Sequence, residues 1–166
     1  NSLITRFLDF ARPLEPRQAP ADVNTVMDRA LAEVQRRAAP VAVSFVRNYS
    51  PDVGLVPIDE QLIERVFSNL LANAVDASPP GSTITVKTRP GVRGVEIAVI
   101  DRGSGIEKSQ MESIFNPFFT TKANGVGLGL AVVSSIIEGH KGRLEVESEP
   151  GEGSIFRVWL PAGSPE

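Results

Sequence analysis

The 166-residue sequence contains no cysteine, and it has only one histidine, one tryptophan and one tyrosine. Without cysteine the chain can form no disulfide, thiolate nucleophile or cysteine metal site, which suits a reducing compartment. One histidine also leaves no histidine cluster with metal-ligand spacing, and no Ser/His/Asp arrangement is visible in the sequence. No apolar run approaches the roughly 20 residues needed to cross a bilayer, and no signal-peptide pattern opens the chain, so we expect a soluble piece.

A concentration of basic charge is missing as well. The net charge is -3 and no basic stripe is interleaved with aromatic residues, so the sequence does not indicate a nucleic-acid partner. Glycine, in contrast, is concentrated, because five of the fourteen glycines fall between Gly103 and Gly129. A glycine inside a helix or strand costs about 1 kcal/mol relative to alanine, so we interpret this cluster as a place where a ligand approaches the backbone.

The first residues are predicted to be separate from the rest of the chain. Apolar residues recur at helical spacing over residues 1–11, and three prolines between residues 13 and 20 predict a stiff, extended connector. We therefore divide the chain into residues 1–16, a helix end with a proline-rich linker, and residues 17–166, one compact domain. The first helix packs either on its own copy in a partner chain or back on the domain. Because the chain opens inside a helix, we expect a fragment of something longer.

The rest of the chain alternates helices with hairpins. Asp22 and Asp59 are placed to cap helices that end near Ala38 and Ala77. Helices mixed with hairpins predict an α/β (α+β) two-layer sandwich, with helices on one face of a mixed, largely antiparallel sheet. The expected strands are residues 41–46, 54–57, 83–89, 95–100, 143–148 and 154–160. One or two helical turns are expected at 109–114, a loop long enough to be a mobile lid through residue 124, and a helix from Gly127 or Leu128 to Glu138.

One helix face carries a row of polar side chains. Asn69, Asn73 and Asp76 recur at spacings of four and three along the predicted helix, so they stand in line on successive turns. Asparagine prefers caps and turns, and two asparagines in mid-helix are therefore informative. The alternative interpretation is the solvated face of an amphipathic helix.

An acid stands where an apolar strand leaves the interior. Asp101, followed by Gly103 and Gly105, fits a turn former, because Asp-x-Gly is common in tight hairpins. In the functional interpretation its carboxylate accepts a hydrogen bond from an exocyclic amine such as that of adenine, and the two glycines let the backbone pass close to the ring. The single histidine, His140, follows a predicted helix, and a role at the helix C-terminus is favoured over catalysis.

Alternating glycines open the next helix. Gly125, Gly127 and Gly129 precede or begin it, where unpaired N–H groups and the positive end of the helix dipole attract anions. The spacing differs from both the P-loop and the dinucleotide-binding fingerprint. Lys122 in the preceding loop offers a mobile cation for outer phosphates, or it is one more solvated lysine.

These motifs in their order resemble a known family. Residues 69–74 resemble the asparagine box, 101–105 the first glycine box, 115–119 the phenylalanine box and 125–130 the second glycine box of the catalytic and ATP-binding domain of sensor histidine kinases. That domain is a branch of the gyrase, heat-shock-chaperone and mismatch-repair ATPase superfamily, and the resemblance implies three helices over the sheet. Residues 1–16 look like the end of the dimerisation and phosphotransfer domain of nitrogen-regulation sensor kinases.

The resemblance implies ATP and Mg²⁺ as ligands. Asp101 would read adenine, with Gly105 and Ser154 assisting through water, and Asn73 with Asn69 would hold magnesium. Phe118 and Phe119 would anchor the lid and meet the phosphoacceptor helices. The implied catalytic residues are Asn69, Asn73 and Lys122, and the implied nucleotide contacts are Asn69, Asn73, Asp76, Asp101, Gly103, Gly105, Ile106, Phe115, Thr121, Lys122, Gly125, Gly127, Leu128, Gly129 and Ser154.

The resemblance also implies the reaction. Hydrolytic cousins carry a glutamate where this chain has Asn69, which cannot act as a base, so the expected reaction is transfer of the γ-phosphoryl group to a histidine. The phosphoacceptor histidine is absent from the chain. The implied partners are the parent's own dimerisation helices in a homodimer and a response regulator receiver domain, in the cytoplasm, with any membrane contact made by other parts of the parent. The alternatives are an anti-sigma-type serine kinase and a nucleotide-sensing module without catalysis.

Overall fold

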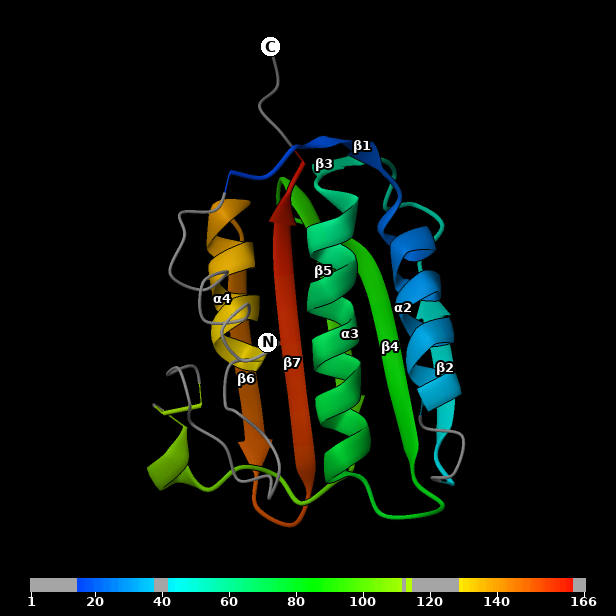
Figure 1. Ribbon diagram of the computed structural model, residues 1–166, viewed down its shortest axis with the longest axis vertical. Helices are drawn as coiled ribbons and strands as arrows, with labels where there is room; N and C mark the ends of the chain where they lie inside the picture. The colour runs from blue at the N-terminus through cyan, green and yellow to red at the C-terminus, as the bar shows by residue number, and fades with distance from the viewer. Residues whose placement is uncertain (1–14, 38–41, 112, 115–128, 163–166) are drawn as a thin grey trace, which may run out of the picture.

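The computed structural model describes residues 15–37, 42–111, 113–114 and 129–162. These residues form one layer of helices and one layer of strands (Figure 1). The helices are α2 (Val23–Arg37), α3 (Glu60–Ala77) and α4 (Gly129–Gly139), with a short 3₁₀ helix η1 (Lys108–Gln110). The strands are β1 (Ala19–Ala21), β2 (Ser44–Tyr49), β3 (Val56–Ile58), β4 (Thr83–Gly91), β5 (Gly94–Asp101), β6 (Arg143–Glu149) and β7 (Gly153–Pro161).

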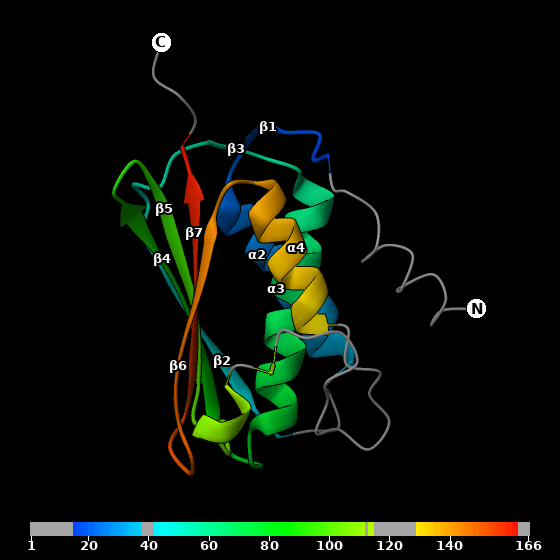
Figure 2. The ribbon, with the colours of Figure 1, turned by 90° about the vertical axis from the view of Figure 1, so that its left-hand side faces the viewer.

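Five of the strands form one mixed sheet in the order β2-β4-β5-β7-β6. The β2–β4 pair is parallel, and the other three pairs are antiparallel. All three helices lie on the same face of this sheet, as the side view shows (Figure 2). The predicted two-layer sandwich, with helices on one face of a mixed, largely antiparallel sheet, is therefore confirmed.

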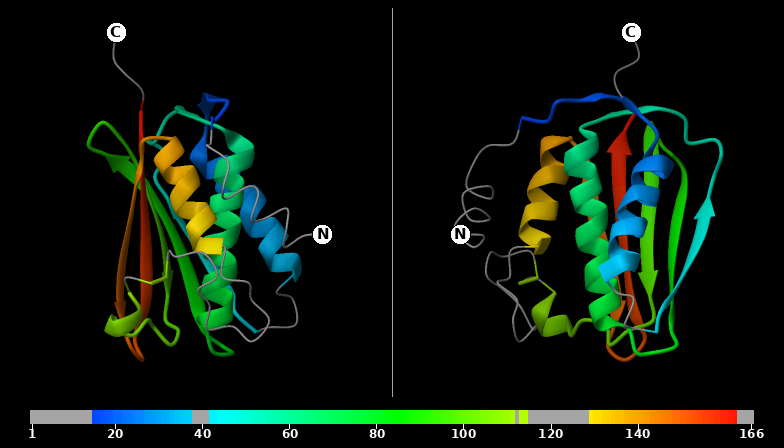
Figure 3. Two further views of the ribbon diagram at one scale, coloured as in Figure 1. Left: turned by 60° about the vertical axis from the view of Figure 1, so that its left-hand side comes forward. Right: turned by 45° about the vertical axis from the view of Figure 1, so that its right-hand side comes forward.

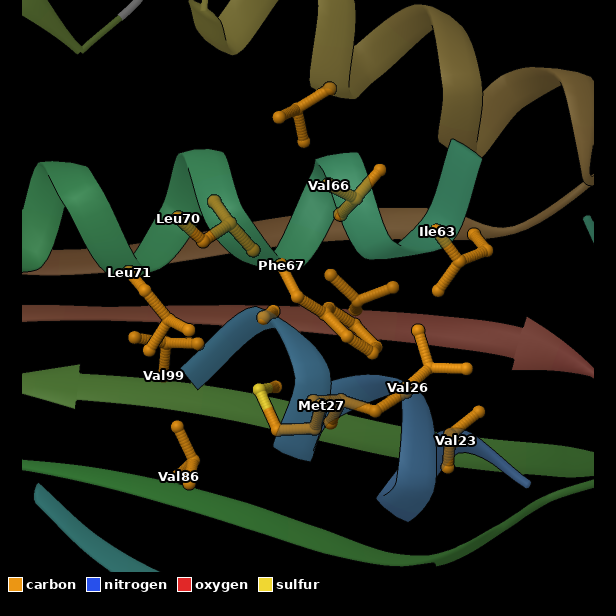
Figure 4. Close-up of a cluster of buried hydrophobic side chains, with 14 of the residues drawn as sticks. Val23, Val26, Met27, Ile63, Val66, Phe67, Leu70, Leu71, Val86 and Val99 are labelled. Atoms are coloured by element: carbon orange, nitrogen blue, oxygen red, sulfur yellow. The ribbon is translucent and has the colours of Figure 1, made fainter. Parts of the chain in front are cut away.

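Alternation along the central strands explains why only one face is covered. Every second residue of β5, starting at Val95, is buried, and the residues between them are only partly buried. The buried side chains of β4 and β5, such as Val86 and Val99, lie beneath Met27 of α2 and Phe67 of α3 (Figure 4). Burying a side chain of this size stabilises the fold by about 1.5–3 kcal/mol, so this core supplies most of the driving force.

Both predicted helix caps are present. The Leu62 backbone N–H donates to Asp59 Oδ1 over 3.2 Å at the start of α3. The Asn24 backbone N–H donates to Asp22 Oδ1 over 2.8 Å, directly before α2. A cap of this kind satisfies one of the N–H groups that a helix start leaves without an intrahelical partner.

The N-terminal third of the domain differs from the prediction in two places. Residues 19–21 were predicted as part of an extended connector, but they pair antiparallel with β3 as a short ribbon. The strand predicted at 41–46 is β2, which begins at Ser44 and continues to Tyr49. The apolar alternation begins at residue 41, before the strand, and breaks at Arg47, inside it, so the pattern alone does not fix the ends of the strand. Pairing with β4, from Ser44 opposite Thr83 onward, fixes them.

His140 joins two helices through its ring. Its side chain is 1% exposed, its Nδ1 donates to the Ile136 carbonyl over 2.9 Å, and its Nε2 accepts the Asp59 backbone N–H over 3.0 Å. Only the neutral ring with its proton on Nδ1 can make both bonds. The predicted role at a helix C-terminus is thus confirmed, and the same ring also ties the end of α4 to the start of α3.

We predict that His140→Phe lowers the free energy of unfolding by about 2 kcal/mol, measured by urea denaturation at neutral pH. Phenylalanine keeps most of the buried volume but leaves the Asp59 N–H without its acceptor. The control is Glu138→Ala, an exposed position on the same helix, which should change stability by less than about 0.5 kcal/mol. Equal stability of the two variants would contradict a structural role for the ring.

Candidate functional site

The predicted site residues that the structure describes gather at one end of the molecule. The His140–Asp59 contact joins the residue that follows α4 to the residue that precedes α3. The two helices therefore run antiparallel. The start of α4 therefore points toward the end of the domain where α3 finishes (Figure 3). Strand β5 also ends there, at Asp101, beside the first residues of β7 (Figure 1).

Three polar side chains form a row across the sheet at this end. Asp101 of β5 is the register partner of Ser154 of β7, and Ser154 is the partner of Ser148 of β6. We call these three residues the polar row. The next inward row is Val99, Phe156 and Val146, so the polar row borders the apolar core directly.

The Asp101 carboxyl group is held at the margin of the core. The side chain is 5% exposed, and its Oδ1 accepts the Gly103 backbone N–H over 2.9 Å. Burial raises the pKa of the Asp101 carboxyl, while hydrogen bonds from the Gly103 and Ser154 backbone N–H groups oppose that shift. Asp101 thus forms the turn that the sequence indicates, and it does so as a buried acceptor.

The loop after Asp101 is fastened on two sides by backbone groups. The Ser104 N–H donates to the Ala77 carbonyl at the end of α3 over 3.1 Å, and the Ser104 carbonyl accepts the Gly151 N–H over 2.7 Å. The Ile106 N–H donates to Ser148 Oγ over 2.7 Å. The loop is therefore clamped between the last turn of α3 and the β6–β7 turn.

This clamp explains why residues 103 and 105 are glycines. A Cβ atom on Gly103 would lie 2.3 Å from the Ala77 carbonyl oxygen. Gly105 has a φ of +73°, and a Cβ there would lie 2.1 Å from the Glu149 carbonyl oxygen. Both glycines were predicted to let the backbone pass close to a ligand ring, whereas contact with the chain's own backbone already requires them.

The asparagine row lies on the helix that contacts this loop. Asn69 and Asn73 are partly buried, and Asp76 is exposed. Asn73 stands one turn before Ala77, whose carbonyl holds the loop. No group of three His, Cys, Asp or Glu side chains with metal-binding geometry occurs among the described residues. Magnesium binding by the two amides therefore stays a prediction, and neutral amide oxygens are ligands that this cation accepts.

Gly129 is the first residue of α4, and a Cβ there would meet no atom of the described residues within 4 Å. The predicted lid also belongs to this part of the chain. The remaining predicted contacts, which are Phe115, Thr121, Lys122, Gly125, Gly127 and Leu128, lie outside the described residues, as do Phe118 and Phe119.

Sequence reasoning missed Ser148. It is partly buried, and its hydroxyl contacts the Ile106 N–H, the Gly153 carbonyl and the Ser154 hydroxyl. Nothing in the local pattern marks it, since a serine near the end of a strand is ordinary. The one signal that could have identified it is its pairing with Ser154 across the predicted hairpin of β6 and β7.

A hollow on the opposite face of the sheet is unrelated to these residues. It has a volume of about 240 Å³ and is lined mainly by side chains of β5, β6 and β7 that point away from the helices. Within it Arg143 stacks on Trp159, 4.9 Å from the ring centroid, and Arg157 pairs with Glu147 nearby over 2.8 Å. Glu96 pairs with Arg89 over 3.1 Å, and none of these charged groups belongs to a predicted motif.

Comparison with known proteins assigns the family. The model of the histidine kinase-, DNA gyrase B- and HSP90-like ATPase family matches residues 58–164. The chain belongs to this family. In this ATPase-family chain the matched region contains α3, α4, η1 and strands β4 to β7, and it leaves out β1, α2, β2 and nearly all of β3.

Sensor histidine kinases are among the relatives of this chain. The sensor histidine kinase ZraS of Klebsiella oxytoca is 37% identical over 162 residues, which are 97% of this chain and 35% of the relative. The chain thus spans about a third of the length of the curated relative it matches. Among solved structures, the mycobacterial sensor histidine kinase MprB superposes with a TM-score of 0.78 at 31% identity, over 87% of this chain and 97% of that one.

A third comparison concerns the fold alone. Full-length ShkA in complex with AMPPNP superposes with a TM-score of 0.87 at 24% identity, covering 99% of this chain and 36% of that one.

Together the matches identify this ATPase-family chain as the ATP-binding catalytic domain of a sensor histidine kinase. Among the residues that the structure describes, no helix is long and apolar enough to cross a membrane.

We predict that Gly103→Ala lowers the free energy of unfolding by more than about 2 kcal/mol, because its methyl group would collide with the Ala77 carbonyl. The matched control is Gly129→Ala, where the new methyl group meets none of the residues that the structure describes, and stability should stay equal or rise by up to about 1 kcal/mol. Chemical denaturation of both variants measures the difference. A Gly103→Ala variant as stable as the wild type would show that the clamp is not tight.

Proposed function

We propose that this domain binds Mg-ATP at the end of the molecule where β5 and α3 end and β7 begins. The domain then donates the γ-phosphoryl group to a histidine of the same parent protein. The observation that carries the proposal is the buried Asp101 carboxyl group, fixed beside Ser154 in a chain of the ATPase family. In the transfer the bond from the γ-phosphorus to the β–γ bridging oxygen breaks, a bond from that phosphorus to a histidine nitrogen forms, and ADP leaves.

Adenine recognition follows from the hydrogen-bonding capacity of the polar row. The Gly103 and Ser154 backbone N–H groups occupy two lone pairs of the Asp101 carboxylate, which keeps further lone pairs for a donor. The exocyclic amine of adenine is such a donor. A hydrogen bond to a buried carboxylate is stronger than a hydrogen bond between neutral groups. The ring would lie between this floor and the clamped loop, which excludes water from the contact.

The phosphates and metal would lie toward the helices. We propose that Asn73 and Asn69 hold Mg²⁺ through their amide oxygens, and that Asp76, Lys122 and the N–H groups at residues 127–129 line the phosphates. When bound, Mg²⁺ neutralises charge that develops on the phosphoryl oxygens. Asn69 cannot remove a proton from water, so the chain holds the nucleotide without promoting its hydrolysis.

The partners are part of the same proposal. Residues 1–16 are proposed to be the end of the dimerisation and phosphotransfer helices with their linker, and residues 17–166 the catalytic domain. The acceptor histidine would come from those helices in a homodimer, and a response regulator receiver domain would take the phosphoryl group onward. We place the domain in the cytoplasm, with any membrane anchor in parts of the parent outside this chain. The AMPPNP complex of ShkA supports nucleotide binding by this fold.

Transfer to histidine is tested by combining this chain with the dimerisation helices of its own parent protein and γ-labelled ATP. We expect label on those helices that is lost in acid and stable in alkali, because a phosphorus–nitrogen bond is acid-labile. An acid-stable label on a separate protein would favour the serine kinase alternative. Bound ATP with no transfer in the full parent would favour a nucleotide-sensing module, and both outcomes would overturn the histidine kinase proposal.

We predict that Asp101→Asn weakens Mg-ATP binding by more than about tenfold, or about 1.4 kcal/mol, because an amide donor can then face the exocyclic amine. Titration calorimetry measures the affinity, and Asp52→Asn, at an exposed position, is the control that should not change it.

The pH dependence supplies a second readout of the same variant. Burial raises the pKa of Asp101, so on acidification this carboxylate becomes protonated at a higher pH than an ordinary aspartate does. The Mg-ATP affinity of the wild type should begin to fall at that higher pH. The Asp101→Asn variant should lack that fall. The same affinity and pH profile in both proteins would remove Asp101 from the site.

A further inference from the structure

Ser148 is the member of the polar row that no motif explains. It lies farthest from Asp101, at the end of edge strand β6, and its hydroxyl group has three hydrogen-bonding neighbours. The neighbours are the Ile106 N–H at 2.7 Å, the Gly153 carbonyl at 2.9 Å and the Ser154 hydroxyl at 2.8 Å. A hydroxyl group has one proton and two lone pairs, so these three contacts fill it completely.

The direction of each of these bonds can be assigned. The Ile106 N–H can only donate, so it occupies one lone pair of Ser148 Oγ. The Gly153 carbonyl can only accept, so it takes the Ser148 proton. The bond between the two hydroxyl groups must then be donated by Ser154, whose proton enters the second lone pair of Ser148.

This direction fixes what Ser154 can offer to a ligand. With its only proton committed to Ser148, Ser154 Oγ presents lone pairs, and the neighbouring Asp101 carboxylate also presents lone pairs. The two residues at the floor of the site are therefore both acceptors. A purine with an amine at C6 suits them, directly or through a water that donates to both, whereas a purine with a carbonyl at C6 brings one more acceptor.

We infer that Ser148 is a positioning residue that determines which purine the site accepts, by holding the Ser154 hydroxyl group as an acceptor. The inference rests on the proposed ATP site. Without the Ser148 hydroxyl group, the Ser154 proton is free to turn toward the ligand and donate to a C6 carbonyl. The loss of Ser148 should then reduce discrimination between bases, beyond any loss of affinity caused by a looser Ile106 N–H.

The test compares ATP with inosine triphosphate, which differs from ATP only along the N1 and C6 edge of the base. Both nucleotides are titrated with Mg²⁺ against the 166-residue chain by calorimetry. In Ser148→Ala we expect the ratio of ATP affinity to inosine triphosphate affinity to fall by about fivefold, the size of one hydrogen bond. Ser148→Thr, which retains the hydroxyl group, should restore the wild-type ratio.

Two further variants separate positioning from packing. Ser50 Oγ also accepts a backbone N–H, from Asp52 over 3.1 Å, but outside the site, so Ser50→Ala should leave the ratio unchanged. Ser154→Ala should lower the ratio by itself, and adding Ser148→Ala to it should lower the ratio no further, because Ser148 acts through Ser154. A merely structural serine would reduce stability and affinity for both nucleotides in any background.

The outcomes separate this inference from the proposed function. A wild-type chain that binds neither nucleotide would contradict the ATP site itself. A wild-type chain that binds ATP and inosine triphosphate equally would contradict adenine recognition by Asp101 and Ser154, and with it the role of Ser148. A wild-type preference that persists in full in Ser148→Ala would overturn only the role of Ser148. If Ser148→Ala fails to fold, Ser154→Ala decides instead, since an unchanged ratio in that variant would equally overturn the inference.

Discussion

The fold depends on burying one face of the sheet and leaving the other uncovered. Alternation along β5 and β7 sends one set of side chains into the helix layer, where Phe67 and Met27 complete the core. The same alternation, continued to the strand ends, places Asp101 and Ser154 on the covered side. The site is thus the last row of the core, with polar residues where the pattern would otherwise put apolar ones.

A charge in that row has a thermodynamic consequence. Because burial raises the pKa of Asp101, the stability that this carboxyl contributes is complete below the ordinary aspartate pKa and is lost as the pH rises through its raised value. At higher pH the ionised group opposes folding. The domain therefore keeps, at a cost in stability, an acceptor that a nucleotide base can use, and the apolar rows above it offset that cost.

The sequence predicted the elements whose signals are local. Asp22 and Asp59 mark helix starts by cap chemistry, and both act as caps in the structure. The fold class followed from mixed helices and hairpins, and the family from four ordered motifs. Long-range pairing was harder, because nothing near residues 19–21 shows that they meet β3, and the alternation around β2 extends beyond the strand.

The candidate site shows the same division. Asp101 was recognisable because an acid after an apolar strand breaks a pattern. The reason for Gly103 and Gly105 was not, because it depends on carbonyl groups at Ala77 and Glu149 that are distant in the sequence. Ser148 is visible only once the β6–β7 register is known.

The ribbon that opens the domain also carries a mechanical consequence. The Arg17 N–H donates to Asp59 Oδ2 over 3.0 Å, while Asp59 caps α3 and its own N–H binds the His140 ring. Tension on the incoming chain would therefore act first on one aspartate that serves two helices. Separating β1 from β3 would weaken the Asp59 cap of α3 and the contact between Asp59 and His140 together. A force on the chain before β1 would thus affect both helix ends through a single residue.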